Sequence, residues 1–203
     1  MNDNKLGPPK VGALGKLVGT IITKLFGWKM VIDLPKDSKM VLVFAYHTTN
    51  WDLVHMLGGI YSCGLKPTWI GKEELFKGPF DWFYKALGGI PLNRHASTNM
   101  VDATVNTIKD NQQIMLGIAP EGTRALAKFW KSGFYHVAYK SQIPMHFAFL
   151  DYKKKVGGIK TGFIPTGDKT KDMAIIEELY KDIQAKYPHE VGPIKLKPYE
   201  YRK

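Results

Sequence analysis

A histidine and an aspartate lie five positions apart at the point where an apolar run ends. His47 follows the run MVLVFAY (residues 40–46), and Asp52 opens the helix-like stretch WDLVHMLGGIYSCG (51–64). A carboxylate on one imidazole nitrogen fixes the tautomer, so that the other nitrogen accepts a proton from a substrate hydroxyl. This layout indicates a general base. A capping aspartate beside an incidental histidine is the alternative that spacing alone leaves open.

No serine or cysteine is placed as a nucleophile, which favours direct attack by a substrate hydroxyl over a covalent intermediate. His55, three residues after Asp52, makes a metal site with His47 conceivable. No further histidine or cysteine pattern supports it, and we expect no metal. Cys63 is the sole cysteine, which excludes an internal disulfide, and we expect it in the core.

A second group of polar residues follows the apolar run QIMLGIAP (113–120). Its members are Glu121, Gly122, Thr123 and Arg124. The glycine permits a tight turn, and an arginine offers a planar fork for a phosphate or carboxylate. Arg94 ends the segment GGIPLNR in the same way. Two such arginines indicate an anionic substrate group, although a surface ion pair is an equal alternative for each.

The elements that must position these residues alternate between strand and helix after Pro35. Strands are predicted at 40–46, 67–71, 88–93, 113–120 and 143–152, with a hairpin at 155–165. Helices are predicted at 51–64, capped by Asn50, and at 79–88, 98–109 (capped by Ser97 or Thr98), 133–140 and 172–186. Such alternation predicts an α/β fold with a mostly parallel mixed sheet flanked by helices.

In folds of this class, ligands bind beyond the carboxyl ends of the strands. Four of the predicted strands are each followed by a polar site: His47, Gly71–Lys72, Arg94 and the segment 121–124. We therefore expect these sites to converge on one pocket.

The chain has 203 residues and a formal net charge of +11, which fits one domain with an anionic partner. Nucleic acid, an anionic membrane and an acidic carrier protein are the options. The basic residues are scattered, and no helix-turn-helix, zinc-finger or RNP-like pattern is visible, so nucleic acid is disfavoured. The N-terminal segment favours the membrane.

Residues 11–28 follow a polar, proline-containing start that does not fit a secretory signal. One face of a helix here would be apolar, comprising Val11, Leu14, Leu17, Val18, Ile21, Ile22, Leu25 and Phe26. The opposite face carries Lys16, Thr20, Thr23 and Lys24. This pattern, ending at Trp28, predicts an amphipathic helix at a bilayer interface rather than a spanning one. A helix packed on its own domain is the alternative.

Four segments in order, HTTNWD, GIPLNR, PEGTR and IPMHFAFLD, resemble the four sequence blocks of the PlsC-type glycerolipid acyltransferases, the lysophosphatidic acid acyltransferase-like family. GKEELFKGPF and FWKSG resemble two further segments of these proteins. The similarity spans about Trp28 to Asp168 and looks like that of the compact bacterial members. It implies a glycerol-3-phosphate acyltransferase-like fold.

The resemblance implies transfer of a fatty acyl group from acyl-CoA or acyl carrier protein to a hydroxyl of a lysophospholipid, such as 1-acyl-glycerol-3-phosphate. His47 would be the base and Asp52 would orient it, while Lys72 would stabilise the oxyanion. The acceptor would be held by Arg94, Glu121, Gly122, Thr123 and Arg124. No cofactor is implied beyond the acyl donor, and no nucleic acid. The protein would lie peripherally on the cytoplasmic, inner face of the cell membrane.

Three residues depart from the family pattern: Tyr46 replaces the usual Asn before the histidine, Asn93 an Asp, and Ala119 an aromatic residue. They leave open a non-phosphate acceptor, such as an aminolipid, alcohol or amine. A lipid- or nucleic-acid-binding protein without turnover is a third possibility. By segment, we expect a membrane-associating region (1–28), the acyltransferase domain (29–187) and a basic tail (188–203).

Overall fold

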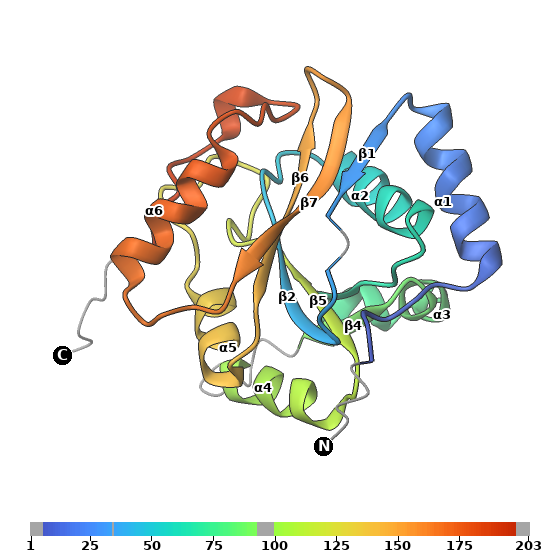
Figure 1. Cartoon of the computed structure of the whole chain (residues 1–203). Helices are drawn as coiled ribbons and strands as arrows, with labels where there is room; N and C mark the ends of the chain where they lie inside the picture. The colour runs from blue at the N-terminus through green and yellow to red at the C-terminus, as the bar shows by residue number, and fades with distance from the viewer. Residues whose placement is uncertain (1–5, 34, 93–99, 198–203) are drawn as a thin grey trace.

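The computed structural model describes residues 6–33, 35–92 and 100–197, and a sheet of seven described strands forms its centre (Figure 1). The strands are β1 (Lys29–Ile32), β2 (Lys39–Phe44), β3 (Thr68–Lys72), β4 (Gly89–Leu92), β5 (Ile114–Ile118), β6 (Met145–Asp151) and β7 (Val156–Phe163). The helices are α1 (Ala13–Leu25), α2 (Trp51–Ser62), α3 (Asp81–Ala86), α4 (Met100–Asp110), α5 (Gly133–Ser141) and α6 (Lys169–Tyr180), with 3₁₀ turns η1 (Glu73–Phe76) and η3 (Pro188–Glu190).

The strand order is β1-β7-β6-β2-β5-β3-β4. Strands β6, β2, β5, β3 and β4 run parallel to one another, while β7 is antiparallel to β6 and parallel to β1. The predicted α/β class with a mostly parallel mixed sheet is therefore confirmed. Because four neighbouring parallel strands carry the predicted polar sites, those sites follow strands that end at one edge of the sheet.

The hairpin predicted at 155–165 is wrong, because Val156–Phe163 is one strand. The chain turns before it, at Lys155, which has a positive φ of 53°. Glycines inside β7 serve close packing rather than turning: a Cβ at Gly158 would lie 2.0 Å from the carbonyl oxygen of Val31 in β1. β1 was not predicted, since four residues with one partly buried face give little periodic signal.

Side chains alternate between the two faces of β2, and each face has its own core. Val41 and Val43 pack with α5 and α6 residues such as Tyr135 and Ile176. Met40 and Leu42 pack on the opposite face with residues of α2, including Met56 and Ile60. The result is a sheet between two helical layers.

η1 and α3 belong to the same layer as α2. Met115 lies in the α2 core, so Gly117, two residues further along β5, shares its face. Trp69 of β3 lies beside Gly117, and its ring contacts the rings of Phe76 and Tyr84. One side of the sheet is therefore covered by α1, α2 and α3, as Figure 1 shows.

The N-terminal helix α1 packs on α2 through one face and exposes another. Gly19 is buried so closely that its Cβ would lie 2.6 Å from the carbonyl oxygen of Gly58. The exposed stripe comprises Leu14, Leu17, Val18, Ile21 and Leu25. The helix thus has a packed side and an apolar exposed side. Thr23, which the sequence placed on the polar face, is buried on the packed side, so that part of the prediction is wrong. The role of the exposed stripe at a membrane stays a prediction. None of the described helices is long and apolar enough to cross a bilayer.

Other boundaries differ slightly from the predictions. α6 covers 169–180 instead of 172–186, and the chain then turns at Ile183 toward the edge of the sheet. The caps predicted for α4 at Ser97 and Thr98 lie outside the described residues. Cys63 is only half-buried and free, directly after α2, rather than in the core. The division into three segments stays a prediction.

Candidate active site

His47 and Asp52 meet as the spacing predicts. The loop after β2 carries His47 to the start of α2, where its Nδ1 lies 3.2 Å from Asp52 Oδ2. The His47 side chain is 21% exposed, whereas that of Asp52 is fully buried. With Nδ1 directed at the carboxylate, Nε2 is the nitrogen that remains to take a proton from outside.

Both oxygens of the Asp52 carboxylate accept hydrogen bonds in addition to the contact with His47. Its Oδ2 also accepts the backbone N–H groups of Thr48 (2.8 Å) and Thr49 (2.9 Å). Its Oδ1 accepts the hydroxyl of Tyr152, at 2.5 Å. These donors, at the amino end of α2, fix the position of the carboxyl group beside His47.

Asn50 does not cap α2 through its side chain, in contrast to the prediction. The loop N–H groups are instead taken by Asp52. The Asn50 amide oxygen accepts a hydrogen bond from Arg124 Nη1. The residue expected to begin the helix therefore joins the base to the arginine that follows β5.

Glu121 links the ends of β2 and β5 at the base itself. The backbone N–H of His47 donates to Glu121 Oε1 at 3.3 Å. Glu121 Oε2 is buried and has no hydrogen-bond partner among the described residues. Burial raises the pKa of Glu121 to about 7, although its backbone hydrogen bonds and His47 act to lower it. A carboxyl group of this kind can hold a proton at neutral pH and donate it to a bound group.

The turn after Glu121 presents an exposed surface. Gly122 has φ +65°, a conformation that favours glycine, and the end of the Lys131 side chain occupies the space of its missing Cβ. Thr123 and Arg124 are both exposed, with Thr123 Oγ1 accepting the Ala125 N–H at 3.3 Å. Two cations, one from the turn and one from 131, are thereby grouped on this side of the base.

The other two predicted anion contacts are only partly described. Lys72 is the last residue of β3, so its backbone is at the carboxyl end of a strand in the same parallel set, but its side chain lies outside the described structure. Arg94 and Asn93 lie outside the described residues altogether. Their placement in the site stays a prediction.

His55 is packed among aromatic rings and not beside the base. The ring centroids of Phe26, Trp28 and Trp51 lie 4.8, 5.2 and 5.9 Å from its own. Burial, and secondly the charge of Lys155, lower the pKa of His55. Across the described part of the chain, no three His, Cys, Asp or Glu side chains are grouped to hold a metal ion.

Sequence reasoning missed three participants: Tyr152, Lys131 and the contact of Asn50 with Arg124. Tyr152 directly follows β6, so the rule that polar residues after parallel strands converge would have included it. Lys131 lies in the FWKSG segment, whose resemblance was noted without a role. No local signal indicated the Asn50 contact, which joins positions 74 residues apart.

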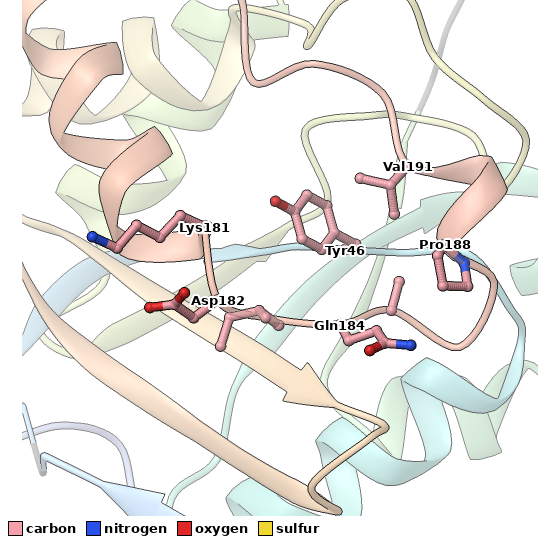
Figure 2. Close-up of a pocket in the computed structure, with 8 residues that line it drawn as sticks. Tyr46, Lys181, Asp182, Gln184, Pro188 and Val191 are labelled. Carbon is pink, nitrogen blue, oxygen red and sulfur yellow. The ribbon is translucent and has the colours of Figure 1, made fainter.

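A pocket of about 390 Å³ opens beside Tyr46, the residue before the base (Figure 2). Its lining is Tyr46, Lys181, Asp182, Ile183, Gln184, Ala185, Pro188 and Val191. The Tyr46 hydroxyl donates to the carbonyl oxygen of Tyr180 at 3.4 Å. The position that departs from the family pattern thus forms one wall of this pocket. None of the predicted site residues is in its lining, so it is not the pocket on which the polar sites were expected to converge.

The structure combines a mostly parallel α/β domain with a His–Asp pair at a strand end and an arginine-bearing turn beside it. This combination agrees with the acyltransferase class that the sequence motifs resemble. The family model described as Acyltransferase matches residues 32–146, more than half of the chain. The chain therefore belongs to the Acyltransferase family, and we regard it as an acyl-transferring enzyme.

The fold has a solved counterpart in the 1-acyl-sn-glycerophosphate (LPA) acyltransferase PlsC from Thermotoga maritima. The two share 18% sequence identity with a TM-score of 0.60, over 85% of this chain and 80% of that one. At this identity the similarity shows the PlsC fold. No curated protein matches the chain in sequence.

Proposed function

We propose that this enzyme transfers a fatty acyl group from a thioester, acyl-CoA or acyl carrier protein, to the hydroxyl of a lysophospholipid such as 1-acyl-glycerol-3-phosphate. The observation that carries the proposal is the His47–Asp52 pair, 3.2 Å apart, bonded through the His47 backbone to Glu121. The proposed base and the proposed acceptor segment, residues 121–124, are therefore in direct contact. A binding protein without turnover has no need of an oriented base.

In the proposed reaction, His47 Nε2 takes the proton of the acceptor hydroxyl as its oxygen attacks the thioester carbonyl carbon. The carbonyl oxygen becomes an oxyanion, for which Lys72 is the proposed partner. Collapse of this intermediate forms the ester and breaks the carbon–sulfur bond. The imidazolium returns its proton to the departing thiolate, so the base is restored.

The acceptor phosphate is assigned to the basic side of the site. Arg124 is exposed and its side chain already reaches across to Asn50 in the loop before α2, beside the base. A phosphate on the acceptor would replace Asn50 as the partner of the Arg124 guanidinium, with Arg94 as a further contact. Gly122 and Thr123 shape the turn, and Glu121 holds it against His47.

The acceptor is amphiphilic, and the surface of the enzyme suits a bilayer. The apolar stripe of α1 is accompanied on the same side of the sheet by exposed residues of α2 (Trp51, Leu53, Val54) and by Phe80, Trp82 and Phe83 at α3. The rings of Phe26 at the end of α1 and Trp51 lie 5.7 Å apart, so the stripe reaches the edge that holds the base. The net charge of +11 favours an anionic surface. We therefore propose that the enzyme binds peripherally to the anionic inner face of the cell membrane.

The test measures thioester-dependent CoA release with lysophosphatidate and with monoacylglycerol, which lacks the phosphate. Wild type should prefer lysophosphatidate, and His47→Ala should lose roughly 10²-fold or more in kcat because a general base contributes that much. Arg124→Lys keeps the charge but loses the fork, so the KM for lysophosphatidate should rise roughly 10-fold or more, with little change for acyl-CoA.

Two outcomes would contradict parts of the proposal separately. If His47→Ala kept more than about a tenth of the wild-type kcat, the base role would be untenable. A wild-type preference for monoacylglycerol, or an equal effect of Arg124→Lys on both acceptors, would favour a non-phosphate acceptor while leaving acyl transfer in place.

A further inference from the structure

Tyr152 reaches the catalytic pair from the position directly after the fourth motif block, IPMHFAFLD, which contains β6. It directly follows β6, and its hydroxyl lies 2.5 Å from Asp52 Oδ1. The other carboxylate oxygen, Oδ2, faces His47 Nδ1 and the N–H groups of Thr48 and Thr49. Each oxygen of the carboxylate thus has its own set of partners, and Tyr152 is the side chain that bonds the oxygen turned away from the base.

The ring that carries this hydroxyl is held in place on several sides. Its centroid lies 5.0 Å from that of Trp28 in an edge-on arrangement, and Lys155 Nζ lies 5.9 Å from it. The Tyr152 backbone N–H donates to the carbonyl oxygen of Gln184 at 2.9 Å. A ring fixed in this way can impose a direction on the carboxylate, rather than follow it.

The hydroxyl is a proton donor under any working condition. Burial first, and then the bond to Asp52, raise the pKa of Tyr152 well above its usual value. The hydroxyl therefore stays protonated, and the short bond to a buried carboxylate is of the charge-assisted kind.

We propose that Tyr152 is a positioning residue for the general base, acting through Asp52. It fixes the plane of the carboxylate so that Oδ2 meets His47, and it withdraws part of the carboxylate charge from the imidazole. The inference rests on the proposed role of His47. It adds a third side chain to the pair, from the residue directly after β6. Trp28, which lies between α1 and β1, packs against the Tyr152 ring and so connects these elements to the base.

The variant Tyr152→Phe keeps the ring and its packing and removes only the hydroxyl. We expect kcat at pH 7 to fall about 5- to 20-fold, as the carboxylate loses its fixed plane, with both KM values within about twofold of wild type. A carboxylate with one donor fewer attracts the imidazolium more strongly, so His47 keeps its proton to higher pH. The acidic limb of the kcat/KM profile should therefore move to higher pH.

The chain offers a matched control in Tyr135→Phe. The Tyr135 hydroxyl donates to Asp172 Oδ2 at 2.6 Å, a second buried tyrosine–aspartate pair, located between α5 and α6 on the opposite face of the sheet. Its loss should lower the melting temperature but leave kcat and the pH profile unchanged. This separates a role in the base from a general loss of stability.

The inference is overturned if Tyr152→Phe leaves kcat unchanged, if the loss appears in KM, or if the acidic limb does not move. Parallel measurement of His47→Ala distinguishes this failure from that of the proposed function. An inactive His47→Ala beside an unaltered Tyr152→Phe refutes only the positioning role, whereas an active His47→Ala refutes the base on which it depends.

Discussion

At the residue scale, the site depends on carboxyl groups buried in two different ways. Asp52 is buried with donors on both oxygens. Glu121 accepts from the His47 N–H with one oxygen and leaves the other unpartnered among the described residues. The second arrangement favours a protonated acid, because burial raises the pKa of Glu121. Two neighbouring acids with such different hydrogen-bonding environments can serve different tasks in one site.

The raised pKa of Glu121 predicts a specific pH dependence of stability. Because burial raises this pKa from its ordinary value of 4.5 to about 7, the folded protein keeps this proton where the unfolded chain has lost it. The contribution is complete below pH 4.5 and is lost as the pH rises through 7, about 3 kcal/mol in all. Glu121→Gln should therefore be as stable as wild type at pH 4 and up to about 3 kcal/mol more stable at pH 8.

Urea unfolding of both proteins at the two pH values measures this difference. Glu177→Gln, at an exposed position of α6, is the control and should change little at either pH. An equal stability difference between Glu121→Gln and wild type at pH 4 and pH 8 would contradict a protonated Glu121.

At the element scale, the antiparallel pairing of α1 with α2 sets the position of the base. The start of α1 lies near the end of α2, where the Val11 N–H donates to the carbonyl oxygen of Gly64. Its far end brings Phe26 to Trp51, the residue before Asp52. The two helices can pack this closely because residue 19 is a glycine. A side chain at this position would meet backbone atoms of α2, which cannot move aside.

Gly19→Ala should therefore separate α1 from α2. The added Cβ would lie 2.6 Å from both the Gly58 carbonyl oxygen and the Ser62 nitrogen, and overpacking of this kind costs about 1–3 kcal/mol. We expect a lower melting temperature and faster limited proteolysis between residues 1 and 28. Gly12→Ala, where a Cβ meets nothing within 4 Å, is the matched control. Equal protection of the two variants would show that α1 tolerates a wider spacing.

At the scale of the whole molecule, apolar exposure gathers on the layer of α1, α2 and α3. The outward stripe of α1 includes Leu14 and Leu25, which are 74% and 75% exposed, and Trp82 at α3 is 69% exposed. The strand ends that carry the base lie at one edge of this layer, where Phe26 meets Trp51. A bilayer on this side would present lysolipid headgroups close to His47.

The proposed membrane contact predicts that Ile21→Glu, in the middle of the α1 stripe, weakens binding to anionic vesicles. Losing the apolar contact and adding a negative charge should lower co-sedimentation roughly 10-fold or more. Activity on short-chain, soluble acceptors should stay near wild type. Ile175→Glu is the control, because Ile175 is similarly exposed (48% against 55%) on α6, across the sheet. Equal loss in the two variants would contradict a specific membrane face.

The sequence by itself determined the fold class, the pairing of His47 with Asp52, and the turn 121–124, because each depends on local features. Apolar periodicity reports helices and strands, and a five-residue spacing from strand end to helix start brings His47 and Asp52 together with little help from the rest of the chain. Ligand sites of α/β folds lie beyond the carboxyl ends of parallel strands as a general rule, so the meeting of His47 with the turn 121–124 was predictable.

Only the tertiary structure decided which distant side chains complete the site. The Tyr152–Asp52 contact joins positions 100 residues apart, and the His47–Glu121 contact joins positions 74 apart. Such pairs depend on the order of strands in the sheet, to which local periodicity is indifferent. The same holds for β7, whose glycines read as a turn in isolation but are required by the close approach of neighbouring strands.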